Sequence, residues 1–335
     1  MIIKSYGDMA QHMFLRSRNA ELKQNIETLS GELASGKVAN ITSRLGGDFT
    51  YLSDIETTLA RLESHMVATG EAKLFATGVQ GSLERLQSNV IDMRDDVLAL
   101  STTMTATDAE QFADRGRLEL ENAISTFNSW SGGRSLFAGT ATSTSPLNDG
   151  DTLMTDLVAE VSGLTTSADI IQAVKDWFAD PAGFDTVMYL GSTTDLSPVE
   201  VSDGERVSIG LRADDPDLKH SLQSFAIAAL VGEASLGLTD EVKVEIGRAV
   251  GMELATSNEA LIAKQADIGF IEGQLERVEA RNTATETSLS IAKNKLVSAD
   301  PYEVHTRLEE AQLQLESLYS VTARSAQLSL LRYMS

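Results

Sequence analysis

Near the end of the chain, between Tyr302 and Tyr333, apolar residues are spaced alternately four and three positions apart. The series is Val304, Leu308, Ala311, Leu315 and Leu318. This spacing is typical of the narrow seam of a coiled-coil helix. Further on, apolar residues move to a second face, which consists of Val321, Leu328 and Leu331. A helix of about 30 residues is on the order of 45 Å long, so we expect another long helix or another subunit to cover it.

A matching stripe occurs in a helix expected from about Ser5 to Ala34. Its members are Leu15, Leu22, Ile26, Leu29 and Leu33. Gly36 follows as a C-cap. Because both stripes have the four-three spacing, the sequence predicts that the chain folds back and its terminal helices pair in an antiparallel coiled-coil bundle.

Further helices are expected in the first half of the chain. One helical region carries Leu52, Ile55, Leu59, Leu62 and Met66, and another is expected from roughly Asp108 to Trp130. Between them lie the clearest heptads of this half, at Val79, Leu83, Leu86, Val90, Met93, Val97, Leu100 and Met104. Strict alternation over about 25 residues favours coiled-coil packing.

The character of the sequence changes after Gly132 and Gly133. The following segment contains four of the five prolines and many Ser and Thr residues. It predicts a strand at Thr186–Leu190, a hairpin around Asp203 and Gly204, and a helix at Ala168–Phe178.

Helical patterns return with a short helix at Leu218–Val231 and a long one from Glu241 to Leu296, in which Asn282 and Thr285 occupy seam positions. Asp300 and Pro301 are suited to be the N-cap and first residue of the closing helix. The predicted fold is mainly α, with a central inserted α+β domain. Its expected parts are helical residues 1–135, the insert 136–236, and helical residues 237–335, which pack with the first part.

Composition narrows the class of function. The chain has 335 residues, a formal net charge of −22 and no cysteine. The negative charge argues against nucleic acid or an anionic membrane as a partner. The absence of cysteine excludes disulfides and thiol catalysis. Residues 1–15 do not resemble a signal peptide, and the longest apolar run, Phe225–Val231, is too short to span a bilayer.

Candidate catalytic and metal-binding patterns are weak. The segment Gly31–Lys37 fits the first seven positions of a phosphate-binding loop, but Val38 stands where a hydroxyl is required, and the segment ends a helix instead of opening one. The histidines are scattered singly at His12, His65, His220 and His305, without the spacing of metal ligands. We therefore expect no catalytic residues, no metal site and no cofactor.

Three stretches resemble the flagellin superfamily. The helix end Leu29–Lys37, followed by Asn40, is similar to the family's "L-x-S-G-K-x-x-N" motif, and Leu308–Leu331 is similar to its closing helix. Between them, Leu136-Phe137-Ala138-Gly139-Thr140 looks most like the "LFAGT" stretch of the hook-associated junction family within that superfamily. The sequence departs from the family pattern after Lys37, where the usual paired aspartates are missing, and at its start, Met1–Lys4.

The resemblance implies a non-enzymatic structural subunit of the bacterial flagellum. It would be exported by the flagellar type III pathway and found outside the cell, and it would assemble as a ring of copies between an adjacent hook-associated protein and the flagellin filament, with an export chaperone as a further partner. The seam residues of both terminal helices, with Val321, Leu328 and Leu331, would then form the assembly interface. Two alternatives stay open: a filament-forming flagellin and a cytoplasmic coiled-coil adaptor.

Overall fold

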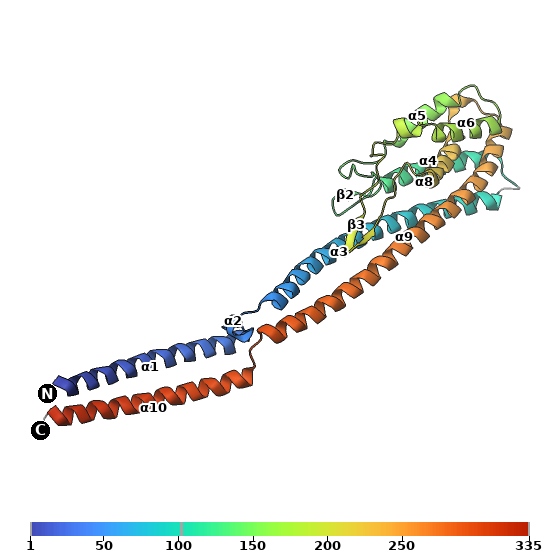
Figure 1. Ribbon diagram of the computed structural model, residues 1–335. Helices are drawn as coiled ribbons and strands as arrows, with labels where there is room; N and C mark the ends of the chain where they lie inside the picture. Colours follow the sequence, from blue (N-terminus) through green and yellow to red (C-terminus); the bar gives the residue numbers. More distant parts are fainter. Residues whose placement is uncertain (1, 101–102, 334–335) are drawn as a thin grey trace. The chain divides into compact units, whose positions relative to one another are not determined.

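The structure is a computed structural model that describes residues 2–100 and 103–333, and most of it is helical (Figure 1). The mainly α-helical prediction is confirmed. The elements in chain order are α1 (Ile2–Ser35), α2 (Ile41–Arg44), α3 (Thr50–Leu100), α4 (Ala106–Phe127), β1 (Trp130–Ser131), β2 (Arg134–Ser135), α5 (Gly150–Glu160), α6 (Ser167–Ala179), α7 (Phe184–Val187), β3 (Val199–Ser202), β4 (Glu205–Val207), α8 (Pro216–Leu230), the 3-10 helix η1 (Ala234–Leu236), α9 (Asp240–Val297) and α10 (Pro301–Tyr333).

The chain divides into two compact units. The terminal unit comprises Met1–Arg61 and Ala284–Ser335, and the central unit comprises Leu62–Thr283. The parts expected from sequence meet instead at residues 135 and 236, where the composition changes. The difference arises because helices α3 and α9 each continue from one unit into the other, and because residues 136–236 share a hydrophobic cluster with both helices.

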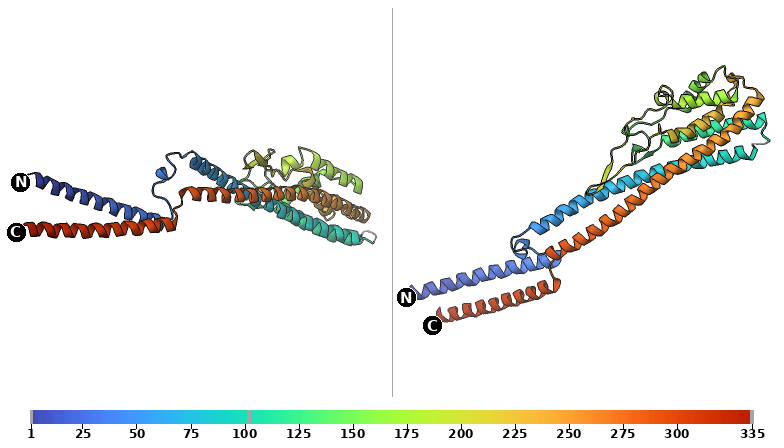
Figure 2. Two further views of the ribbon diagram at one scale, coloured as in Figure 1. Left: turned by 60° about the horizontal axis from the view of Figure 1, so that its bottom comes forward. Right: turned by 45° about the vertical axis from the view of Figure 1, so that its right-hand side comes forward.

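Within the central unit, α3 and α9 pack together as an antiparallel pair (Figure 2). Polar contacts mark their register: Lys73 Nζ lies 2.8 Å from Glu279 Oε2, and Thr77 Oγ1 donates to Glu272 Oε1 at 3.0 Å. The predicted heptad positions form the buried side of α3, namely Val79, Leu83, Leu86, Val90, Met93 and Val97. Facing α9 contributes Ile246, Val250, Leu254, Leu261, Ile268 and Leu275.

The last predicted heptad position is not helical, because α3 ends at Leu100. Met104 lies beyond the helix but is buried, and a Cβ placed on Gly247 of α9 would be 2.6 Å from its sulfur. Met104 therefore closes the end of the seam from the connection to α4. The next helix, α4, begins with a capping box in which Thr105 and Asp108 exchange hydrogen bonds.

Helices α4 and α8 approach each other very closely at Gly116. A Cβ on this glycine would lie 2.6 Å from Ala228 Cβ and 3.1 Å from the carbonyl oxygen of Phe225. Such a short approach requires residues without bulky side chains on both helices. Sequence periodicity alone does not reveal this contact.

In the middle segment, the predicted strand Thr186–Leu190 is wrong. Residues Phe184–Val187 form the short helix α7, and only Tyr189 makes a bridge, to Leu147. One helical turn places Phe184 and Met188 on the same side, where both are fully buried. The predicted helix at Ala168–Phe178 is confirmed as α6.

The hairpin predicted around Asp203 and Gly204 is confirmed as β3 and β4, with Val199 opposite Val207. Asn282, a polar residue in the predicted seam of α9, is buried and donates from Nδ2 to the carbonyl oxygen of Val201 at 3.0 Å. The seam of α9 is therefore polar at Asn282, because this side chain binds the backbone of the β3 and β4 hairpin.

The stretch Leu136–Thr140 is a buried connector. Leu136, Phe137 and Ala138 are almost fully buried, and Gly139 has a φ of +58°. A Cβ on Gly139 would lie 2.5 Å from the carbonyl oxygen of Ser192, so this position requires glycine.

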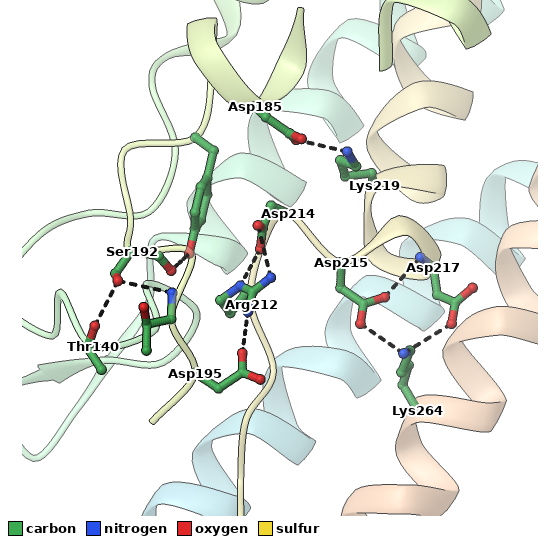
Figure 3. A network of polar contacts seen from close by, with 12 residues as sticks. Thr140, Asp185, Ser192, Asp195, Arg212, Asp214, Asp215, Asp217, Lys219 and Lys264 are labelled. Atoms are coloured by element: carbon green, nitrogen blue, oxygen red, sulfur yellow. Dashed lines mark hydrogen bonds and ion pairs between the residues drawn. The ribbon is translucent and has the colours of Figure 1, made fainter. Parts of the chain in front are cut away.

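Charged groups hold the chain around this connector (Figure 3). Arg212 donates to Asp214 at 2.7 Å and also pairs with Asp195. A second set joins Lys264 Nζ of α9 to Asp215 at 2.9 Å and to Asp217 at 3.1 Å. These pairs tie the start of α8 to α9 and to the loop that precedes β3.

A third polar set joins three helices of the central unit. Lys175 of α6 donates to Glu253 of α9 at 2.7 Å, and His220 Nε2 of α8 lies 3.5 Å from the same carboxylate. The contact with His220, with a further contribution from Lys175, lowers the pKa of the Glu253 carboxyl from its ordinary 4.5, against the opposing effect of burial.

Candidate assembly interface

Helices α1 and α10 lie side by side in the terminal unit and run in opposite directions (Figures 1 and 2). Backbone hydrogen bonds join the two connections at one end of the pair: Val38 N donates to Val297 O, and Ala299 N donates to Gly36 O, each at 3.0 Å. Asp300 caps α10 by accepting from the amide of Tyr302 at 2.9 Å. The predicted caps at Gly36, which has a φ of +67°, and Asp300 are thus confirmed.

A small apolar cluster fills the space between the two helices. Leu29 of α1 is 2% exposed and packs with Val304, Leu308 and Ala311 of α10 and with Ala299. Ile26 and Val38 are partly buried against them. Burial of a leucine side chain contributes about 1.5 to 3 kcal/mol, so Leu29 is a principal contact of this helix pair.

The residues expected at the assembly interface fall into three groups. Leu22, Leu29 and Leu308 are buried within the chain, and Leu15, Ile26, Leu315 and Leu318 are partly buried. Leu33 and Val321 are exposed, whereas the side chains of Leu328 and Leu331 lie outside the described residues. Leu29 already packs in the first turns of α10, so no turn of α10 is left to cover Leu33, one turn further on.

Large apolar side chains outside the four-three seam of the pair are also exposed. Met13 and Phe14 of α1 are 70% and 68% exposed, and Leu313 of α10 is 66% exposed. The periodicity of the seam does not identify these residues, because they fall outside it. Helical geometry could have identified outward positions, since Met13 is about 160° around α1 from Leu15 and Leu313 is about 160° around α10 from Leu315.

A polar contact crosses the pair beyond the apolar cluster. Hydrogen bonds from Asn19 and then Lys23 of α1 lower the pKa of the Tyr319 hydroxyl on α10. Because both partners donate hydrogen bonds to the phenolic oxygen, they favour the deprotonated form of Tyr319. This contact extends the association of α1 with α10 toward the ends of the chain.

The structure also places the weaker candidates from the sequence, except His12, whose side chain lies outside the described residues. Gly31–Ser35 forms the last turns of α1, so the segment that fits part of a phosphate-binding loop is a helix terminus. His65 faces Asp203 at 3.3 Å, and His305 faces Glu309 at 3.6 Å in the same helix. Among the described residues, no group of three or more His, Cys, Asp or Glu is placed to hold a metal ion.

None of the helices in the described part of the chain combines the length and the apolar composition needed to cross a bilayer.

Comparisons with known proteins give two matches. Residues 253–334 match the bacterial flagellin C-terminal helical region. The fold resembles a solved structure from Vibrio parahaemolyticus whose protein has been assigned as a flagellar hook-associated protein, with a TM-score of 0.51 and 16% sequence identity, over 73% of this chain and 95% of that chain. No curated protein sequence matches the chain significantly.

The two matches agree with each other and with the geometry. The first covers most of α9 and α10, which include the helix that pairs with α1. The second concerns the fold alone, because the identity is low. The chain therefore has a flagellin-like C-terminal helical region within a mainly α-helical, flagellin-like fold, and these similarities indicate a structural, non-enzymatic protein.

Proposed function

We propose that this protein is a subunit of the bacterial flagellum that joins the hook-associated ring to the flagellin filament. The observation that carries the proposal is the pair α1 and α10, which buries a small cluster but leaves large apolar side chains such as Met13, Phe14 and Leu313 in water. Exposed apolar groups of this size favour burial against another molecule.

In this proposal the interface expected from sequence has two roles. Leu22, Leu29 and Leu308, with the partly buried Leu15, Ile26, Leu315 and Leu318, hold α1 against α10. Leu33 and Val321 join the outward apolar residues in contacts with neighbouring subunits, as would Leu328 and Leu331. The partners are further copies of the chain in a ring, flagellin, the adjacent hook-associated protein and an export chaperone.

The similarity to a structure assigned as a hook-associated protein and the resemblance of Leu136–Thr140 both support the junction role. The location that follows is extracellular, reached through the flagellar type III pathway without a cleaved signal. The match of residues 253–334 to flagellin favours one other candidate, a filament-forming flagellin.

A genetic experiment tests the proposal. The gene is deleted in the bacterium that encodes it and replaced by the natural sequence, by Leu313→Gln, or by the matched control Leu118→Gln, which changes an exposed leucine of the central unit. We expect the deletion and Leu313→Gln to leave hooks without filaments and to release flagellin into the medium, while the control restores filaments.

The number of copies in sheared filaments separates the candidates. A copy number that corresponds to one ring per filament supports the junction protein. A copy number equal to that of the main filament subunit supports the flagellin. Retention of the chain in the cytoplasm, with normal filaments in the deletion strain, rejects both and favours a cytoplasmic coiled-coil adaptor.

A further inference from the structure

The seam between α8 and α9 contains polar side chains at buried positions. Ser257 of α9 is 0% exposed and Gln223 of α8 is 6% exposed, although most other buried residues of the two helices are apolar. Glutamine is seldom buried in proteins, because moving an amide out of water is unfavourable unless hydrogen bonds replace those to water. Both side chains therefore require partners inside the protein.

Three atoms of this seam receive no such partner from the chain. Gln223 Nε2, Ser257 Oγ and His220 Nε2 are buried and make no hydrogen bond with any described residue. His220 Nε2 does face Glu253 Oε2, but the distance of 3.5 Å is long for a hydrogen bond. By contrast, Ser224 of α8 is equally buried and donates to the carbonyl oxygen of His220 at 2.8 Å. Native proteins seldom leave several buried polar atoms of one seam unpaired.

The three atoms belong to helix sides that face each other. His220 and Gln223 are three residues apart on α8, and Glu253 and Ser257 are four residues apart on α9, so each pair shares one side of its helix. The contact between His220 and Glu253 brings these two sides together. The residues that carry the unpaired atoms thus lie within about 6 Å of this contact, measured along either helix axis.

The charges and the donor set of the seam favour a neutral ligand. Lys175 of α6 donates to Glu253 at 2.7 Å, so the charge of this carboxylate is balanced within the protein. An amide nitrogen only donates hydrogen bonds, whereas a serine hydroxyl both donates and accepts. A metal cation cannot bind the amide nitrogen of Gln223 as a donor, but a water molecule can accept from it and also pair with Ser257.

We propose that the α8 and α9 seam binds internal water, held by Gln223 Nε2 and Ser257 Oγ beside the contact of His220 with Glu253. Buried waters typically make about three hydrogen bonds to groups that would otherwise be unpaired. Because these bonds form only when the polar groups of the two helices face each other, the water fixes the position of α8 along α9. The site lies within the central unit and does not depend on the proposed function.

Urea unfolding of the full-length protein tests the site. Ser257→Ala removes a partner of the water, so we expect the unfolding equilibrium constant to rise roughly threefold to tenfold. The matched control is Ser224→Ala, which removes an equally buried hydroxyl that bonds only to its own helix and should have a smaller effect.

The opposite result is expected if the seam is dry. Ser257→Ala would then remove a buried hydroxyl that has no hydrogen bond, and the protein would become more stable. An unfolding midpoint that is unchanged or raised by Ser257→Ala therefore overturns the proposal.

A second substitution tests whether the two side chains hold the same water. Gln223→Met keeps the length of the side chain and removes its amide, so it should lower the unfolding midpoint as Ser257→Ala does. We expect the double variant to lose less stability than the sum of the single losses, because the first substitution already weakens the binding of the shared water. Additive losses overturn a shared water.

The water can also be observed directly. A crystal structure of the natural protein, at a resolution that shows ordered water, should contain a water oxygen about 3 Å from both Gln223 Nε2 and Ser257 Oγ. A direct hydrogen bond between these two side chains, an empty seam, or an ion with close oxygen ligands in place of water would each overturn the proposal.

Discussion

Leu29→Ala tests whether the small apolar cluster holds α1 against α10. Leu29 is 2% exposed and packs with Val304, Leu308 and Ala311. Replacing a buried leucine by alanine costs 2 to 5 kcal/mol, and the cost is smallest where the site can collapse. Since the cluster lies between only two helices, we expect about 2 to 3 kcal/mol, a value at the low end of that range.

Amide hydrogen exchange measures this effect locally. A loss of about 2 to 3 kcal/mol raises the exchange rate of protected amides in α1 and α10 roughly 30-fold to 150-fold. Amides of the central unit should be unchanged, because their core is a separate cluster. The matched control is Leu33→Ala on the same helix, where the side chain is 42% exposed and the expected effect is small.

Unchanged exchange in α10 of the Leu29→Ala variant would show that the cluster contributes nothing to pairing. Equal effects of Leu33→Ala and Leu29→Ala would show that burial within the chain does not determine the stability of the helix pair. An increase in the exchange rate spread equally over both units would show that the cluster does not stabilise the terminal unit alone.

Three further predictions concern the central unit. Gly116→Val should lower the free energy of unfolding by roughly 1 to 3 kcal/mol in urea titrations, because the new Cβ would collide with Ala228. The control Gly81→Ala, at an open helical position, should be neutral or slightly stabilising. Equal effects of the two substitutions would contradict the close approach of α4 and α8. Asn282→Ala should cost roughly 1 to 3 kcal/mol and raise hydrogen exchange in β3 and β4, whereas unchanged exchange there would show that Asn282 does not hold the hairpin. The lowered pKa of Glu253 contributes stability that is present above its unfolded value of 4.5 and is lost as pH falls through the folded value. Glu253→Gln should therefore unfold at a lower urea concentration than the natural protein near neutral pH, and this difference should narrow in acid. A difference in unfolding midpoint that does not depend on pH would argue against this linkage.

Several features could be read from the residues alone because their causes are local. The four-three spacing at Val79–Val97 predicts a buried helical side, since helical geometry places such residues on one face. Asp300 and Pro301 indicate the start of α10 because capping needs only the next few amides. Asp203-Gly204 between alternating apolar residues likewise indicates the β3 and β4 hairpin.

Other features depend on contacts between distant segments, which periodicity does not contain. Thr186–Leu190 has strand-like residues, yet burial of Phe184 and Met188 favours the turn of α7. The unit boundaries fall inside α3 and α9 because both helices are long enough to contribute residues to each of the two compact units.

The candidate interface shows the same division. The spacing of Leu22, Leu29 and Leu308 predicts apolar positions on paired helices, and the sequence alone determines that much because side-chain direction follows from helical geometry. Whether such a position is covered depends on where the partner helix begins and ends. Only the tertiary structure decides that Leu29 is buried, that Leu33 is exposed beyond the start of α10, and that Leu313 lies on an open face, because burial is a property of both helices together.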